Sequence, residues 1–239
     1  MVSTAELDAE FETTDEHLKV LAAGFETASP QQVLRWSLDE FGRDVALATG
    51  FGVEGCVLVH MLAELDQSAR IFFLDTDVLF PQTYELRTRM ENRYGVTIER
   101  RATTLSLSDQ AALHGDRLWE TRPDLCCQLR KVEPLRQALS GLRAWTTAIR
   151  RDQSPARASA GIVERDTRFG IVKINPLATW TSRDVWNFAL KHDVPYNPLH
   201  NEGYPSIGCS PCTTPVQIGE DPRAGRWRGI VKTECGLHR

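Results

Sequence analysis

The chain has 239 residues, 41% of them hydrophobic, and it carries 28 Lys and Arg against 32 Asp and Glu, for a net charge of -4. This balance gives no general attraction to nucleic acid or to an anionic membrane surface. No stretch has the length and apolar character of a membrane-spanning helix, and the first residues are acidic where a signal peptide would be basic. We therefore expect a cytoplasmic protein that meets any anionic ligand locally, and the sequence leaves open whether it forms a homo-oligomer.

Two amphipathic helices are predicted at the start of the chain, one near residues 4–22 and one beginning at Ser29-Pro30. Strands are then predicted at 45–48, 71–74, 96–98, 144–149 and 171–174, with helices at 56–65 and from Pro81 onward. This alternation indicates an α/β fold, a Rossmann-like doubly wound parallel sheet with right-handed crossovers. The polar, arginine-containing residues 151–169 are predicted to form a loop that becomes ordered on ligand binding.

Ligands of open parallel sheets bind beyond the carboxyl ends of the strands, so the segments that follow the strands are candidate contacts. Residues 49–55 form a glycine-rich turn whose backbone N–H groups can approach a phosphate. Residues 74–77, Leu-Asp-Thr-Asp, offer short polar side chains to an adenosine. The run from Arg150 to Arg157 is typical of an anion clamp, because a guanidinium binds phosphate or sulfate through two hydrogen bonds. The plainer alternatives are a tight turn, a helix cap and a solvated basic loop.

Six cysteines stand at positions 56, 126, 127, 209, 212 and 235. Structural disulfides are not expected in a reducing cytosol. Cys126-Cys127 and the Cys209-Ser-Pro-Cys212 turn form two local pairs that can surround one metal centre, either zinc or a 4Fe-4S cluster. Adjacent cysteines favour the cluster, because neighbouring side chains on a helix diverge by about 100° and reach separate irons. Zinc, and thiols without metal, remain alternatives.

Together these segments resemble the iron–sulfur branch of the phosphoadenylyl-sulfate and adenylyl-sulfate reductase family, from about residue 45 to the end. The motifs that carry the resemblance are FGVEG, LDTD with LFPQTYE, CCQLRKVEPL, IRRDQSPAR, KINPLATWTSRDVW, VPYNPLHNEGYPSIGCSPCT, EDPRAGRW and ECGLH. Relatives usually read SFGAED and LDTG in the first two motifs. This chain departs from the family pattern at Gly50, Gly55, Asp77 and Ala148.

The resemblance implies thioredoxin-dependent reduction of adenosine 5′-phosphosulfate (APS) to sulfite and AMP, in sulfate assimilation and cysteine biosynthesis. It implies a 4Fe-4S cluster on Cys126, Cys127, Cys209 and Cys212. The reaction would pass through an S-sulfocysteine on Cys235, with Lys131 and His238 as further catalytic residues. The expected substrate contacts are Thr49, Gly50, Phe51, Gly52, Leu74, Asp75, Thr76, Arg150, Arg151, Gln153, Ser154, Arg223 and Arg226.

The expected organisation is a single sulfonucleotide reductase domain over residues 1–239. Within it, 1–42 are N-terminal helices, 43–194 are the nucleotide-binding core, and 195–239 are the cluster loop and the catalytic C-terminal segment. One alternative function is reduction of the 3′-phosphorylated substrate, PAPS. Another is an adenylating enzyme of the ATP pyrophosphatase type, which would need an SGGxDS-like loop. A cluster-bearing redox regulator would need a DNA-binding helix pair or a basic face, and the sequence has neither.

Overall fold

The computed structural model describes residues 14–237, which fold around a six-stranded sheet. Its strands are β1 (Val45–Thr49), β2 (Arg70–Asp75), β3 (Ile98–Ala102), β4 (Ala144–Thr146), β5 (Val163–Asp166) and β6 (Ile171–Ile174). Their order is β3-β2-β1-β4-β6-β5, and every neighbouring pair is parallel except β5 and β6. The predicted Rossmann-like α/β class is confirmed, with one antiparallel edge strand added.

The helices are α1 (Asp15–Phe25), α2 (Pro30–Phe41), α3 (Val53–Leu65), α4 (Pro81–Tyr94), α5 (Leu107–His114), α6 (Leu118–Thr121), α7 (Pro123–Cys127), α8 (Glu133–Leu139) and α9 (Ser182–Lys191). A π-helical turn, η3 (Gln128–Val132), joins α7 to α8. Short 3-10 turns are η2 (Gly42–Asp44), η4 (Arg151–Gln153), η5 (Pro155–Arg157), η6 (Pro198–Glu202) and η7 (Ser210–Cys212). The segment after α9 thus contains little regular structure, as predicted.

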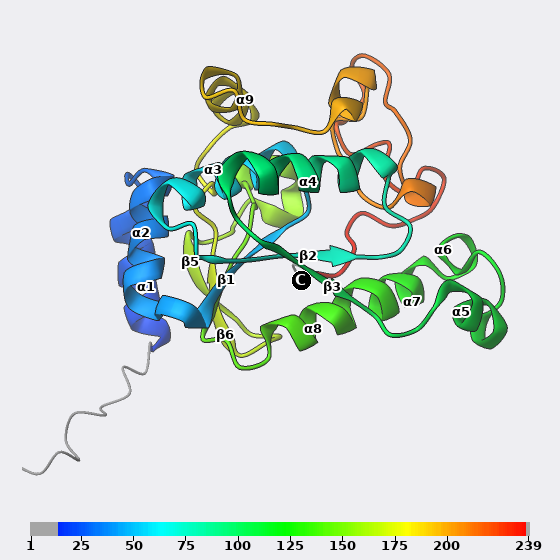
Figure 1. Ribbon diagram of the computed structural model, residues 1–239, viewed down its shortest axis with the longest axis horizontal. Coiled ribbons are helices and arrows are strands. Elements are labelled where there is room, and N and C mark those ends of the chain that lie inside the picture. The colour runs from blue at the N-terminus through cyan, green and yellow to red at the C-terminus, as the bar shows by residue number, and fades with distance from the viewer. Residues whose placement is uncertain (1–13, 238–239) are drawn as a thin grey trace, which may run out of the picture.

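Helices cover both faces of the sheet because successive strand residues point to opposite sides. On one face Leu47, Ile71 and Phe73 belong to a core shared with α3, α4 and α9. On the other face Phe72 and Trp145 pack with α8. Figure 1 shows α3 and α4 on one side of the strands and α8 on the other, which is the doubly wound arrangement.

Several boundaries differ from the prediction, and one is the end of β4, which lies at Thr146 rather than at residue 149. The third strand is β3 at 98–102 rather than 96–98, because this outer strand pairs with β2 through polar residues such as Arg100. Residues 151–169 are not all loop, since β5 forms the opposite edge of the sheet and buries Val163. Edge strands often carry charged residues, so the apolar pattern that predicts a strand is missing from their sequence. Helix α1 begins at Asp15, and residues 4–13 of the predicted first helix lie outside the described residues.

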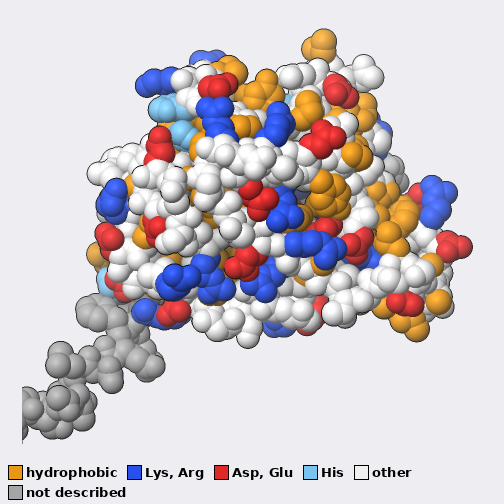
Figure 2. All heavy atoms as spheres, viewed as in Figure 1, with side chains coloured by type: hydrophobic (Ala, Val, Ile, Leu, Met, Phe, Trp, Pro, Cys, Tyr) orange, Lys and Arg blue, Asp and Glu red, His pale blue; other side chains and the backbone are white. Residues whose placement is uncertain are grey.

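The surface gives no sign of a membrane span or a uniform charge on the face in view. Within residues 14–237, no helix is long and apolar enough to cross a membrane. Figure 2 shows Lys and Arg interspersed with Asp and Glu on one face of the molecule. On that face, the acidic side chains offset the attraction of the basic ones for a polyanion.

Candidate metal centre and active site

The strand order reverses between β1 and β4, which lie side by side in the sheet. Crevices at such a switch point are where open α/β sheets bind ligands. The segments that follow these two strands meet through Glu54, whose carboxylate lies 3.0 Å from Arg150 Nη2 and accepts from Gln153 Nε2 at 3.1 Å. The fold therefore brings together the glycine-rich turn and the arginine-containing run, which are far apart in the sequence.

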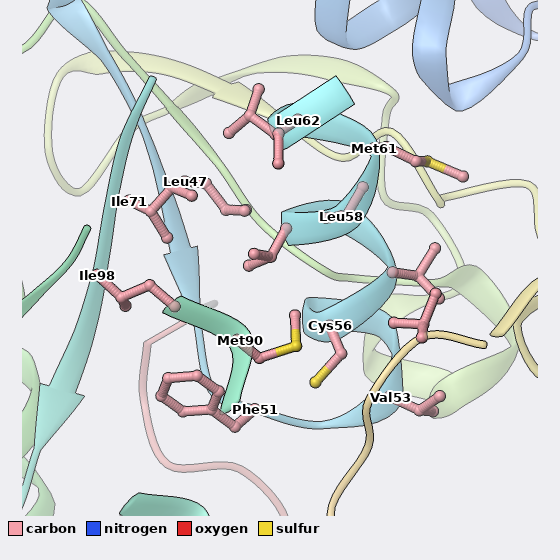
Figure 3. Close-up of a cluster of buried hydrophobic side chains, with 14 of the residues drawn as sticks. Leu47, Phe51, Val53, Cys56, Leu58, Met61, Leu62, Ile71, Met90 and Ile98 are labelled. Carbon is pink, nitrogen blue, oxygen red and sulfur yellow. The ribbon is translucent and has the colours of Figure 1, made fainter. Parts of the chain in front are cut away.

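The turn after β1 is stabilised from within. Thr49 Oγ1 accepts from the N–H of Phe51, and a Cβ at Gly55 would lie only 2.6 Å from the same oxygen. Gly55 therefore accommodates Thr49, which gives a physical reason for this departure from the family pattern. The ring of Phe51 is buried in the core against Phe73, so it does not face the ligand edge (Figure 3). Gly52 precedes α3 and has no side chain to cap that helix.

The loop after β2 is also internally bonded. Asp75 accepts from Tyr84 Oη at 2.7 Å, from Arg100 Nε at 2.6 Å and from the N–H of Asp77 at 2.9 Å. Burial opposes ionisation of Asp75, but these hydrogen bonds outweigh it and lower the pKa of the carboxyl. Leu74 is half-buried. Thr76 Oγ1 lies 3.3 Å from Cys209 Sγ, so Thr76 joins this loop to the second cysteine pair.

Asp77 has a φ of 59°, in the left-handed region, where Asp is better tolerated than most residues; the LDTG motif of the resemblance has glycine at this position. Its carboxylate binds Arg100 at 2.7 Å and Arg130 at 2.8 Å. Arg130 is only 1% exposed and also donates to Gln110 and to the carbonyl of Thr76. Arg130, which the sequence analysis did not single out, thus ties the helix after the first cysteine pair to the loop after β2.

The predicted anion clamp after β4 contains arginines that already have carboxylate partners. Arg151 binds Glu26 at 2.6 Å, away from the switch point. Arg157 binds Glu234 at 2.9 Å, and Ser154 Oγ donates to the same carboxylate at 3.3 Å. The arginine run therefore contacts the C-terminal segment through Glu234, the residue before Cys235.

The two cysteine pairs line one small cavity. Its walls are Thr76, Val78, Trp119, Pro123, Cys126, Cys127, Arg130, Lys131, Cys209 and Cys212. Helix α7 and turn η3 supply one side, and the loop of η7 supplies the other, held by a hydrogen bond from Ser210 N to Val78 O. All six cysteines are free thiols. Among residues 14–237, no three His, Cys, Asp or Glu side chains are arranged to hold a single ion.

The thiols in this cavity suit a cationic centre. Burial, followed by the neighbouring charges of the other cysteines, raises the pKa of Cys126 to about 12 and that of Cys212 to about 11. Burial also raises the pKa of Cys127. Burial acts to raise the pKa of Cys209 too, but Lys131, Thr76 and Arg226 outweigh it and lower that pKa. Ionising all four thiols here therefore requires positive charge beside them.

Lys131 stands between the thiol-lined cavity and Cys235. Its ammonium is near enough to the Cys209 and Cys235 thiols to interact electrostatically with both. Burial would lower the pKa of Lys131, but the nearby Cys209 and Cys235 raise it, so the lysine stays protonated. Cys127 also interacts with Cys235. The structure therefore brings Lys131, Cys235 and the cysteine pairs into one site.

Two further cations, Arg223 and Arg226, lie in this site. Burial lowers the pKa of Arg223, which interacts with Glu234, Arg226 and Cys235. The Arg226 guanidinium lies 4.6 Å from the ring of Trp227, and its buried Nε has no hydrogen-bond partner within residues 14–237. A Cβ at Gly208 would collide with this guanidinium, so the glycine allows its position.

The remaining residues separate into three groups. His238, predicted to be catalytic, lies outside the described residues. Cys56 is fully buried in the core beside Met90, where burial raises its pKa to about 12, so it is an inert thiol (Figure 3). Glu54 and Glu234 were not among the predicted site residues, and Arg157 was predicted only as part of the anion clamp. The available signal was their place inside the FGVEG, IRRDQSPAR and ECGLH motifs.

Residues 44–215 match the family model of the phosphoadenosine phosphosulfate reductase domain. Adenosine 5′-phosphosulfate reductase of Salinibacter ruber is 49% identical over 222 residues, which are 92% of this chain and 88% of the relative. Adenosine 5′-phosphosulfate reductase 1 of Bacillus subtilis is 48% identical over 207 residues, 86% of this chain and 89% of the relative.

Among solved structures, the PAPS reductase from Candida auris, a phosphate complex, aligns with a TM-score of 0.76 and 34% identity over 84% of this chain and 98% of that one. Yeast FAD synthetase aligns with a TM-score of 0.55 and 14% identity over 84% of this chain and 75% of that one, which shows a shared fold alone. The fold is that of the adenine nucleotide alpha hydrolase-like α/β proteins, here with a thiol-lined cavity beside the ligand edge. Within that class, the chain belongs to the phosphoadenosine phosphosulfate reductase domain family.

Proposed function

We propose that this protein is an adenylyl-sulfate reductase, which reduces APS to sulfite and AMP in sulfate assimilation. The relatives named above, at 48% and 49% identity over most of their length, support this substrate. Thioredoxin is the proposed reductant, and the cytosol, where thiols stay reduced, is the proposed location. We further propose that residues 1–239 act as one domain with the nucleotide core in 43–194.

A 4Fe-4S cluster fits the thiol-lined cavity. Cys126, Cys127, Cys209 and Cys212 would hold it, because four thiolates from two local pairs match the ligand set of a cube. Zinc, which four thiolates can also bind tetrahedrally, is the alternative occupant of the same site. When bound, the cluster would supply positive charge that keeps the thiols ionised.

Cys235 is the proposed nucleophile. Its thiolate attacks the sulfur of the phosphosulfate, the S–O bond to the phosphate breaks, and AMP leaves with that electron pair, so that S-sulfocysteine forms on Cys235. Lys131, Arg223 and Arg226 would neutralise sulfate and phosphate oxygens as charge shifts to the leaving group. Arg226 Nε is available for such a bond because it is buried without a partner within residues 14–237.

Thioredoxin completes the cycle. One of its thiolates attacks the Cys235 sulfur, sulfite leaves with the electrons of the S–S bond, and a mixed disulfide forms. The second thioredoxin thiol then releases Cys235 as a thiolate, so the two electrons come from the dithiol. Because a protein must reach Cys235 in this step, the C-terminal segment has to move away from the site.

The observation in the site that supports this function most strongly is that Lys131 lines the cavity of the cysteine pairs, Cys209 included, and lies near enough to Cys235 to interact with it electrostatically. The single ammonium of Lys131 would act on both the proposed nucleophile, Cys235, and a proposed cluster ligand, Cys209. The experiment that tests it is turnover of APS with reduced thioredoxin, followed by sulfite release. Turnover that is lost in Cys235→Ser supports the proposal, and turnover unaffected by that change would refute it.

PAPS reduction is a second candidate, favoured by the similarity to the Candida auris structure. The cysteine pairs favour APS, because the resemblance assigns them to the iron–sulfur branch. Comparing kcat/KM for APS and PAPS in the same preparation distinguishes the two. A higher value for PAPS would assign the chain to the other substrate.

A further inference from the structure

The segment around Cys235 is held on its N-terminal side by the carboxylate of Glu234, by the carbonyl of Thr233, which accepts from Arg223 Nη2 at 2.8 Å, and by the ion pair of Lys232 with Asp124. Glu234 accepts from Arg157 through Nε at 3.1 Å and Nη2 at 2.9 Å, and from Ser154 Oγ at 3.3 Å. Arg223 Nη2 lies 3.2 Å from the same group. Glu234 is 9% exposed, and a buried carboxylate needs such partners to stay charged. Two arginines from distant parts of the chain therefore converge on Glu234.

The C-terminal side of Cys235 is held as well. Arg168 donates to the carbonyl of Gly236, and Leu237 packs against the core cluster that contains Leu135 of α8. Figure 1 shows this last segment, drawn in red, returning toward β2 and β3. Cys235 is thus fixed from both sides, and the Glu234 carboxylate is paired with Arg223, which also interacts with the thiol.

We propose that Glu234 is a positioning residue, whose carboxylate holds Cys235 beside Lys131 for attack on the substrate. The inference rests on the proposed function. Consecutive Cα atoms are about 3.8 Å apart, so anchoring Glu234 restricts where the Cys235 thiolate can lie. Glu234 also offsets repulsion, because Arg157 and Arg226 both act as like charges on Arg223. Without this carboxylate, the guanidinium groups and the Cys235 thiolate are held less firmly in position relative to one another.

The test separates the two half-reactions. In Glu234→Gln, a neutral side chain of similar shape, formation of S-sulfocysteine in a single turnover should slow by roughly 10- to 100-fold, the range expected for a misplaced reacting group. Release of sulfite by thioredoxin from enzyme already sulfonated should be unchanged, as should iron content. Glu234→Asp keeps the charge and should recover part of the rate. Glu220→Gln, which breaks a carboxylate–Arg228 pair in the same region, is the matched control and should behave as the parent.

A second readout does not depend on turnover. Amide hydrogen exchange of residues 233–237 should become faster in Glu234→Gln and stay unchanged in Glu220→Gln. If the parent forms no adduct with APS, the proposed function fails while this exchange difference still tests the anchor. Equal exchange and equal sulfonation rates in parent and Glu234→Gln would overturn the inference. Faster sulfonation in the variant would also overturn it, since the carboxylate would then be competing with the substrate.

Discussion

The carboxylate of Asp77 lies 2.8 Å from Nη1 of Arg130, a guanidinium whose side chain is 1% exposed. The pair joins the loop after β2 to the helical segment that follows Cys126 and Cys127. Arg130 also donates a hydrogen bond to the carbonyl of Thr76, and the hydroxyl of Thr76 contacts Cys209. One buried arginine therefore links both cysteine pairs to the sheet.

Replacing Asp77 by glycine, the residue of the LDTG motif, should destabilise this protein. Glycine removes backbone strain of about 1 kcal/mol at a positive φ. It also leaves buried Arg130 without its charged partner, which should cost about 3 kcal/mol. We expect a net loss of about 2 kcal/mol in the free energy of unfolding, measured by urea denaturation. Asp77→Asn, which tolerates the backbone but lacks the charge, should lose stability too, and an Asp77→Gly variant more stable than the parent would contradict this account.

Cys126→Ser and Cys209→Ser should each lose the cluster and the activity together. Each change removes one of four thiolates from the cavity, and a hydroxyl does not replace it as a ligand. Iron and sulfide are each expected at about four per chain in the anaerobic parent and well below that in the variants. Cys56→Ala is the control: it should keep its iron and lose about 1 kcal/mol of stability as a small core truncation. Full iron content in both serine variants would show that these cysteines are not the ligands of the cluster.

Lys131→Ala should keep the cluster but lose much of its turnover. The buried ammonium acts on both Cys209 and Cys235, and a charge directed at the transition state contributes about 3 kcal/mol. The measurement is kcat/KM for APS beside the iron content of the same preparation. Lys191→Ala, at the exposed end of α9, should match the parent. Parent-like kinetics in Lys131→Ala would make this residue structural only.

Arg226→Ala should weaken APS binding by about 2 kcal/mol, the size of a lost charge-assisted hydrogen bond. The reason is that its buried Nε has no partner within residues 14–237 and is free to bind an anion. Arg228→Ala is a suitable control because that guanidinium is exposed and paired with Glu220. Binding can be measured by calorimetry with the Cys235→Ser variant, and equal affinities for both alanine variants would contradict the assignment.

The central strands and their following loops were predictable because their apolar runs are short and bounded by turns. β1, β2 and β6 lie where the pattern predicted, as do the N-terminus of α4 and the capped start of α2. Strand β5 was missed because its residues are Val-Glu-Arg-Asp, and an edge strand does not need apolar residues on both faces. The charged residues of β5 therefore do not give the alternating apolar pattern from which a strand is predicted.

The site was predictable at the level of motifs but not of partners. Cysteine spacing indicated a shared centre, and the structure gathers Cys126, Cys127, Cys209 and Cys212 around one cavity. The pairing of Arg157 with Glu234 depends on contacts between segments 77 residues apart, which spacing does not encode. For the same reason, the sequence could not reveal that Arg151 turns away toward Glu26.

The most direct test is the mass of the peptide bearing Cys235 after incubation of the protein with APS and no thioredoxin. The account predicts one added sulfonate on that peptide and a single stoichiometric burst of AMP, because a thiolate attacks and nothing yet removes the product. Reduced thioredoxin should then remove the added mass as sulfite. Cys235→Ser should bind APS and keep its iron but form no adduct. An adduct on another cysteine, or repeated turnover by the serine variant, would contradict the assignment of Cys235.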